Sequence, residues 1–210
     1  MSEPADTLGA LLLPGLVRRR ERLVILVDGG SGSGKTTFAN GLAAGLAAAG
    51  RPVRPIGMDE FYPGWDGLAA ASAMVVTDLL HPTDPGFRRW DWVADRPAER
   101  VDLDAGQDLL IEGCGALTPA SAAYATITLL LERPATARKA LALARDGESF
   151  AAHWDRWAAQ EHRHWREHRP RELADLVLCL DAEIERNPSF PEEKVGQRGS
   201  SPPARSSAAR

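Results

Sequence analysis

The chain has 210 residues, 44% of them hydrophobic and 26% charged, with a formal net charge of −4. This length suits one domain of ordinary size, and the composition is that of a globular protein, which excludes a disordered or fibrous chain. The acidic balance argues against a surface built mainly for nucleic acid, so we expect no nucleic-acid partner.

The N-terminal segment does not have the pattern of a secretory signal, because the apolar residues 11–13 are followed by Pro14 and a run of arginines. No apolar run approaches the roughly 20 residues that a membrane-spanning helix needs. Cys114 and Cys179 lack metal-ligand spacing and suit a reducing compartment. We therefore expect a cytoplasmic protein with no membrane partner.

Residues 23–27 form the first predicted strand. They are a run of Leu, Val and Ile without alternation, which is typical of a strand buried on both faces of a parallel sheet. Residues 35–49 favour a helix, because Phe38, Leu42 and Leu46 recur every four residues among alanines. A strand, a glycine-rich loop and a helix therefore follow one another directly.

The middle of the chain continues this alternation. Residues 52–58 predict a second strand and residues 68–80 a second helix. Residues 81–97 carry three prolines, a glycine, three arginines and two tryptophans. This composition favours a long ordered loop, and such loops commonly serve substrates or partners.

The second half of the chain predicts strands at 108–111, 126–131 and 175–180, and helices at 135–145 and 148–168. Five strands separated by helical segments predict an α/β fold with three layers and a mainly parallel sheet. We assign residues 1–181 to this domain. Residues 182–210 are rich in Pro, Ser, Arg and Glu, which predicts a disordered tail.

The glycine-rich loop matches G-x-x-x-x-G-K-[ST] and lies between a predicted strand and a predicted helix. Its glycines let backbone N–H groups converge on phosphate oxygens, Lys35 is expected to reach the β- and γ-phosphates, and the Thr36 hydroxyl to ligate Mg²⁺. A flexible Gly/Ser linker is the alternative, but a linker would not join a buried strand directly to a helix. The sequence therefore predicts a site for ATP and Mg²⁺ formed by Gly29, Gly30, Ser31, Gly32, Ser33, Gly34, Lys35, Thr36 and Thr37.

Carboxylates stand at the ends of three predicted strands, namely Asp28, Asp59 and Glu112. Ligands of open α/β sheets bind at the carboxyl ends of the strands. Phosphoryl transfer needs Mg²⁺ held by a hydroxyl and carboxylates, and a group that accepts the proton of the acceptor hydroxyl. Asp59 suits the role of base, and Glu112 a role at the metal. The alternative is that each carboxylate is a helix cap or a solvated turn residue.

Three segments together resemble the uridine kinase and phosphoribulokinase group of P-loop kinases: residues 29–37, Asp59-Glu60-Phe61-Tyr62 and Glu112-Gly113. The resemblance covers about residues 23–180, and the D-x-F-Y segment is its most discriminating part. It implies the P-loop NTPase fold, with a core sheet of five parallel strands and a small helical lid over the phosphates. It also implies that Asp59 is the base.

A basic helix at about 133–148 is the candidate lid. Arg138 and Arg145 are seven positions apart, so they share one helical face. Such arginines can stabilise charge on the transferring phosphoryl group, and we expect both to be catalytic together with Lys35. The Arg145-Asp146 pair resembles an Arg-Asp pair in the family's lid. A solvated basic helix face is the alternative.

Trp90-Asp91-Trp92 resembles the Tyr-Asp-Phe segment with which uridine kinases help hold the nucleoside. Tyr62, Trp90 and Asp91 are therefore expected to bind the acceptor. Asp95 stands where the family usually has a histidine. Tryptophans in a loop can alternatively be packing anchors for that loop.

His164-Trp165-Arg166-Glu167-His168 fits the H-x-x-E-H spacing of a class of zinc peptidases. The surrounding helix is dense with arginine, which opposes a cation site, and no third ligand is apparent. We interpret this segment as a solvated helix face. We interpret Cys114, beside the predicted site, as a small buried thiol.

The predicted function is transfer of the γ-phosphoryl group of ATP to a hydroxyl of a small molecule. A nucleoside is the first choice of acceptor, followed by another sugar, a vitamin precursor or a nucleotide. The alternatives are a regulatory NTPase that switches a protein partner, which leaves the D-x-F-Y segment without a role, and a kinase for a large precursor in the manner of zeta toxins. A homo-oligomer is compatible with each.

Overall fold

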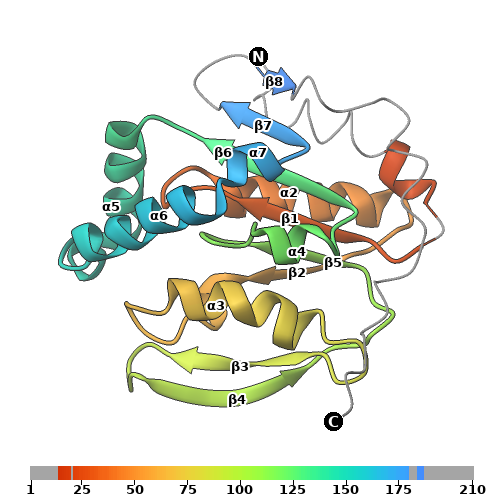
Figure 1. Cartoon of the computed structure of the whole chain (residues 1–210), viewed down its shortest axis with the longest axis horizontal. Coiled ribbons are helices and arrows are strands. Elements are labelled where there is room, and N and C mark those ends of the chain that lie inside the picture. Colours follow the sequence, from red (N-terminus) through yellow and green to blue (C-terminus); the bar gives the residue numbers. More distant parts are fainter. Residues whose placement is uncertain (1–13, 20, 180–183, 187–210) are drawn as a thin grey trace, which may run out of the picture.

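The computed structural model describes residues 14–19, 21–179 and 184–186 (Figure 1). From edge to edge, the main sheet runs through β2 (Arg54–Gly57), β5 (Leu109–Glu112), β1 (Val24–Asp28), β6 (Ile127–Glu132), β7 (Leu176–Cys179) and β8 (Ile184–Arg186). The first five strands are parallel, and β8 pairs with β7 in the antiparallel direction. The predicted α/β fold with five mainly parallel strands is confirmed.

Alternate residues of β1 enter two separate hydrophobic cores, one on each face of the sheet. Ile25 and Val27 pack in one core with Phe38, whereas Leu26 packs in the other with Leu68. All five β1 residues are buried, which explains the unbroken apolar run in the sequence. The sheet is therefore the middle of three layers.

Helices cover both faces of this sheet. Residues 14–17 are helical, and the elements that follow them are α2 (Lys35–Ala48), a 3₁₀ turn (Met58–Glu60), α3 (Leu68–Met74), its π-helical continuation (Val75–Leu79) and α4 (Pro119–Ala122). The predicted helix over 68–80 thus exists but widens in its second half.

Two longer helices follow β6 and lie together at one end of the sheet (Figure 1). They are α5 (Ala135–Ala151) and α6 (Trp154–His168), and the short α7 (Pro170–Leu173) leads into β7. Gly147 interrupts α5 with a φ of 67°. The boundary predicted between helices at 145 and 148 corresponds to this kink, while α6 begins later than expected, at Trp154.

The loop predicted over 81–97 is wrong, because the chain forms a β-hairpin of β3 (Gly86–Asp91) and β4 (Arg96–Asp102). Two of the three prolines precede β3, so they do not interrupt it. The Asp91 carboxylate accepts the backbone N–H groups of Val93 at 3.0 Å and Ala94 at 2.9 Å, which fixes the turn. The hairpin lies below α3 in Figure 1.

The strand β8 falls within the segment 182–210 that the sequence assigned to a tail, and the rest of that segment lies outside the described residues. Among the residues that the structure does describe, no helix combines the length and apolar character needed to cross a membrane.

Candidate active site

Parallel pairing brings the predicted strand ends to one edge of the sheet. Glu112 at the end of β5 is in register with Val27 of β1 and with Gly57 of β2. The 3₁₀ turn that carries Asp59 begins directly after Gly57. The chain therefore gathers the P-loop, Glu112 and Asp59 at the carboxyl edge, where α/β folds bind ligands.

The glycine-rich loop joins β1 to α2 and packs against α5. Gly32 has a φ of +77°, and a Cβ placed on it would lie 2.0 Å from the carbonyl oxygen of Arg138. A side chain at this position would therefore be strained and would push α5 away. The element predicted as the lid thus lies against the glycine-rich loop.

Lys35 is buried at the centre of the loop. Its Nζ donates a hydrogen bond to the Gly30 carbonyl at 3.1 Å and lies 3.6 Å from the Cys114 sulfur. Burial lowers the pKa of the Lys35 amine, but the surrounding acidic side chains raise it overall, among them Glu112, Glu161 and Asp59. Lys35 therefore carries its positive charge at neutral pH.

Thr36 and Glu112 lie in direct contact. The Thr36 hydroxyl donates to Oε1 of Glu112 at 2.8 Å, and Glu112 is buried. Burial raises the pKa of Glu112, while the charge of Lys35 and the hydrogen bond from Thr36 lower it. A hydroxyl and a carboxylate are the oxygen ligands that Mg²⁺ prefers. The described residues hold no cluster of three or more His, Cys, Asp or Glu side chains that could hold a metal ion.

Asp59 is exposed at the same edge of the sheet. Its backbone carbonyl accepts the indole N–H of Trp92 at 2.9 Å, which ties the hairpin to the turn that carries it. Its carboxylate is near enough to the buried groups to raise the pKa of both Lys35 and Glu112. Asp59 thus faces solvent beside the loop.

The two predicted lid arginines differ in their surroundings. Arg138 is buried, and its Nη1 donates to the Ser31 carbonyl at 3.0 Å and to Oε2 of Glu161 at 3.1 Å. Arg145 is exposed, and its charge contributes to lowering the pKa of Glu112. Arg138 therefore lies directly against the P-loop, whereas Arg145 acts on the site only through its charge.

Asp28, the third strand-end carboxylate, is fully buried and has a structural environment. It accepts the backbone N–H groups of Gly29, Gly115 and Leu117 at 2.6, 3.1 and 2.8 Å. His164 Nε2 lies 3.1 Å from Oδ2, the oxygen that also accepts the Leu117 N–H. Asp28 therefore connects β1, the loop after β5 and α6, and it is buried rather than a solvated turn residue.

The predicted acceptor residues occupy three different environments. Tyr62 is buried, and its hydroxyl donates to the Cys114 carbonyl at 2.8 Å. Trp90 is half-buried at the end of β3, and Asp91 holds the hairpin turn. Burial raises the pKa of the Cys114 thiol to about 12, so this group is a neutral thiol beneath the loop.

An aromatic cluster lies at the hairpin tip, and its central member is Trp65. The ring centroid of Trp65 lies 5.0 Å from that of Trp92, 5.7 Å from Phe150 and 4.2 Å from the stacked ring of His153. These rings come from the segment after D-x-F-Y, the hairpin, the end of α5 and the residue before α6. They form a wall whose hairpin member, Trp92, is 37% exposed and bonded to Asp59.

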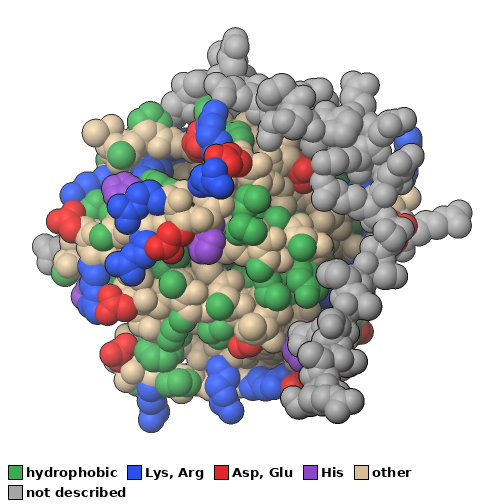
Figure 2. All heavy atoms as spheres, in the orientation of Figure 1, with side chains coloured by type: hydrophobic (Ala, Val, Ile, Leu, Met, Phe, Trp, Pro, Cys, Tyr) green, Lys and Arg blue, Asp and Glu red, His purple; other side chains and the backbone are tan. Residues whose placement is uncertain are grey.

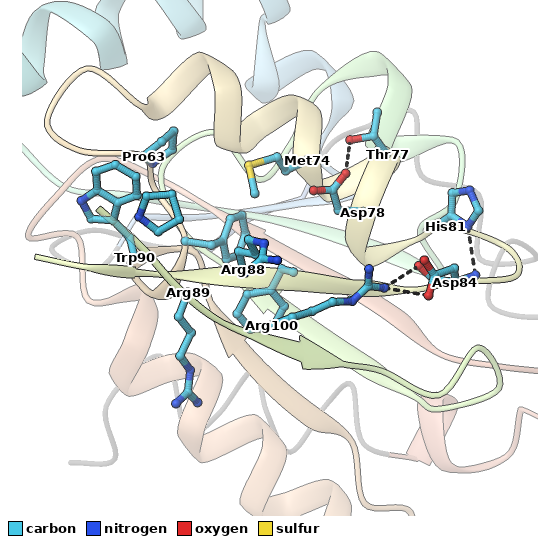
Figure 3. A pocket seen from close by; sticks show the side chains of 14 residues that line it. Pro63, Met74, Thr77, Asp78, His81, Asp84, Arg88, Arg89, Trp90 and Arg100 are labelled. Carbon is cyan, nitrogen blue, oxygen red and sulfur yellow. Dashed lines mark hydrogen bonds and ion pairs between the residues drawn. The ribbon is translucent and has the colours of Figure 1, made fainter. Parts of the chain in front are cut away.

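A pocket of about 460 Å³ lies between the hairpin and the π-helical continuation of α3 (Figure 3). Met74, Thr77 and Asp78 line one side, and Arg88 and Trp90 lie on the hairpin side. Arg88 donates to the Ala98 carbonyl at 3.2 Å and has no ion pair among the described residues. Phe61, of the D-x-F-Y segment, lines the same pocket.

Two solved structures are similar to this chain over nearly their whole length. One is described as a possible uridine kinase from Bacillus stearothermophilus, with a TM-score of 0.58, 20% identity, and coverage of 83% of this chain and 96% of that one. The other is designated a fructose transport system kinase from Silicibacter sp. TM1040, with a TM-score of 0.54, 21% identity, and coverage of 84% and 100%. The chain therefore shares the α/β fold of these two structures, with a P-loop between β1 and α2. No protein-family model and no curated protein matches the sequence.

Within this fold, α6 contributes residues that sequence reasoning missed. The interpretation of residues 164–168 as a solvated face is wrong for His164, which is 4% exposed and lies beside Asp28. One turn earlier, Glu161 is 2% exposed and lies against the P-loop. The outer face of α6 is charged, as the predicted pattern requires, and Figure 2 shows charged side chains over α5 and α6. The signal available in the sequence was the i, i+3 spacing of these two residues, which places them on one helical face with Trp157.

Proposed function

We propose that this protein is an ATP- and Mg²⁺-dependent kinase that transfers the γ-phosphoryl group to a hydroxyl of a small molecule, with a nucleoside as first choice. The observation that carries the proposal is the contact of the Thr36 hydroxyl with Glu112 at 2.8 Å beside the P-loop. This pair supplies the metal ligands at the loop, and the adjoining strand end presents Asp59 to solvent. Phosphoryl transfer requires this combination.

Each residue of the nucleotide site then has a role that its surroundings support. The charged Lys35 amine and the loop N–H groups hold the phosphates, and Thr36 with Glu112 holds Mg²⁺. When bound, Mg²⁺ would neutralise part of the negative charge of the phosphates. Arg138 lies against the loop, where a guanidinium can stabilise charge on the transferring group. Arg145 is the second candidate for that role.

Asp59 is the candidate base. An exposed carboxylate at a strand end can accept the proton of an acceptor hydroxyl, provided that the hydroxyl lies within hydrogen-bond distance. The bond from Trp92 to the Asp59 carbonyl positions the turn relative to the hairpin. We infer that the acceptor lies between Asp59 and the hairpin.

The size and lining of the pocket support a small acceptor. Its volume of about 460 Å³ is within the range of small-molecule sites, roughly 300–1,000 Å³. Phe61 and Trp90 contribute aromatic rings to the lining, and Arg88 offers a cation for a polar group. A nucleoside combines a flat base with hydroxyl groups, which matches this lining better than an aliphatic alcohol does.

The test is ADP formation with Mg·ATP against a panel of nucleosides, nucleotides, pantothenate, fructose and sugar alcohols. Lys35→Ala serves as the blank, because it removes the charge at the phosphates. We expect ADP formation to require an acceptor and a nucleoside to give the highest kcat/KM. Equal ADP formation without any acceptor, still dependent on Lys35, would instead favour the regulatory NTPase.

A further inference from the structure

Glu161 is a buried carboxylate in contact with the P-loop. Its Oε1 accepts the backbone N–H of Ser31 at 2.7 Å, and the thiol of Cys114 lies 3.3 Å from the same oxygen. Its Oε2 accepts Nη1 of Arg138 at 3.1 Å. Only 2% of the Glu161 side chain is exposed, and 7% of Arg138. One carboxylate thus accepts hydrogen bonds from a loop amide and from the buried guanidinium.

These partners are those that a phosphate oxygen would use. The N–H groups of a glycine-rich loop form a concavity for anions, and an arginine beside it adds a positive charge. A Cβ placed on Gly30 would lie 2.0 Å from Arg138 Nη1 and 3.0 Å from Glu161 Oε2, so both groups lie directly against the loop. Glu161 is therefore an internal anion at the edge of the phosphate site.

A bound nucleotide would bring a second anion to the same place. Two negative groups in contact repel each other strongly in a buried environment, where water screens them little. The negative phosphates therefore compete with Glu161 for the Ser31 amide and for Arg138.

The helix that carries Glu161, α6, also forms hydrogen bonds with the 65–68 segment on the proposed acceptor side. Gln160, the preceding residue, donates to the Trp65 carbonyl at 2.6 Å and accepts the Leu68 N–H at 3.3 Å. Arg156, one turn earlier, forms an ion pair with Asp66. The 65–68 segment carries Trp65 of the aromatic cluster. A movement of α6 would therefore displace residues at the P-loop and at the aromatic cluster at the same time.

We propose that Glu161 is a positioning residue. Without nucleotide it holds Arg138 at the P-loop and occupies the Ser31 amide, and a bound nucleotide displaces it from both partners. Because α6 also holds the 65–68 segment, this exchange is coupled to the acceptor side and limits ATP hydrolysis when no acceptor is bound. The inference rests on the proposed function, since it requires that the loop binds ATP.

The first experiment measures the dissociation constant of Mg·ATP for the full chain and for Glu161→Gln. The amide keeps the shape and an acceptor for the Ser31 N–H but removes the competing charge. We expect Glu161→Gln to bind ATP about fivefold to tenfold more tightly, which corresponds to removing one partly screened repulsion. Acceptor-independent ADP formation should rise, and the KM for ATP should fall more than kcat changes. Glu167→Gln, on the exposed part of the same helix, should match the wild type.

The outcomes separate the two proposals. Wild-type protein that does not bind Mg·ATP would overturn the proposed function and this inference with it. Wild-type protein that binds, together with a Glu161→Gln variant that binds no tighter, would overturn the inference alone. A merely structural Glu161 would give weaker binding, because the loop would lose a partner.

A second measurement uses wild-type protein, because loss of one partner of a buried ion pair can unfold a chain. Hydrogen exchange of the α6 amides is compared with and without Mg·ATP, and Lys35→Ala is the control. We expect faster exchange in α6 and in 65–68 when nucleotide is bound. Unchanged or slower exchange in α6 with bound nucleotide would show that Glu161 is not displaced, which overturns the inference.

Discussion

The proposed nucleotide side of this site is built from consecutive residues, whereas the proposed acceptor side is assembled from distant ones. Residues 29–36 supply the loop, and their backbone makes most of the anion site. The acceptor side combines the 61–68 segment, the β3–β4 hairpin and α6. A short sequence motif can thus specify a backbone anion site. The shape of a pocket and its ring contacts depend instead on packing between separate elements.

The substitution expected to have the largest effect lies where the two sides meet. Asp59→Asn should lower kcat by about 10²- to 10⁴-fold, the usual contribution of a general base, while ATP binding stays unchanged. Steady-state kinetics and ATP titration check this. Glu60→Gln is the matched control, because its pair with Arg89 at 3.1 Å is largely exposed and worth little. A full-rate Asp59→Asn variant would remove Asp59 from the mechanism.

The next prediction tests the metal ligands on the nucleotide side. Glu112→Gln should raise the Mg²⁺ concentration for half-maximal activity by about 10- to 100-fold, because a neutral amide replaces a carboxylate at the metal. The amide oxygen can still accept the Thr36 hydroxyl, so the fold should be retained. A Mg²⁺ titration of activity is the measurement, with the exposed Glu99→Gln as control. An unchanged titration curve would assign Glu112 a structural role.

The third prediction tests how closely the lid packs on the loop. Gly32→Ala should lower the free energy of unfolding by about 1–3 kcal/mol, because it adds a Cβ at positive φ against the Arg138 carbonyl. Gly41→Ala in α2 is the control: nothing lies within 4 Å of its added Cβ. It should raise the free energy of unfolding by about 0.5–1 kcal/mol. Urea unfolding of both variants measures these changes. Changes in the free energy of unfolding that have the same sign in both variants would contradict the prediction.

The smallest effect is expected on the acceptor side. Arg88→Ala should raise the KM for the acceptor about fivefold to tenfold, the effect of one lost hydrogen bond of ordinary strength, with little change in the KM for ATP. Arg163→Ala, an exposed arginine on α6, tests whether net charge alone has this effect. Equal loss of affinity for ATP would mean that the pocket and the nucleotide site are not separate.

The parallel sheet and the loop could be predicted because their signals are local. The apolar run at 23–27 and the periodic helix after it need no information from elsewhere in the chain. The gathering of Glu112 beside Thr36 also followed, because parallel strands end at a common edge.

The hairpin and the buried face of α6 could not be predicted in the same way. The prolines near β3 suggested irregular structure, although they flank the strand, and the turn depends on the Asp91 carboxylate. Glu161 and His164 are polar residues in a charged helix, and only the positions of Arg138 and Asp28 show that they are buried. Burial of a charge depends on a partner that the local sequence does not contain.

In the proposed kinase, the bond from the Trp92 indole to the Asp59 carbonyl has a consequence for how the choice of acceptor can change. The hairpin that borders the pocket also fixes the backbone that presents the candidate base. A mutation that reshapes the hairpin for a new acceptor therefore also displaces the carboxylate that must activate it. A change in acceptor choice would therefore also change the turnover rate. Replacing the hairpin would need a compensating change in the turn that carries Asp59.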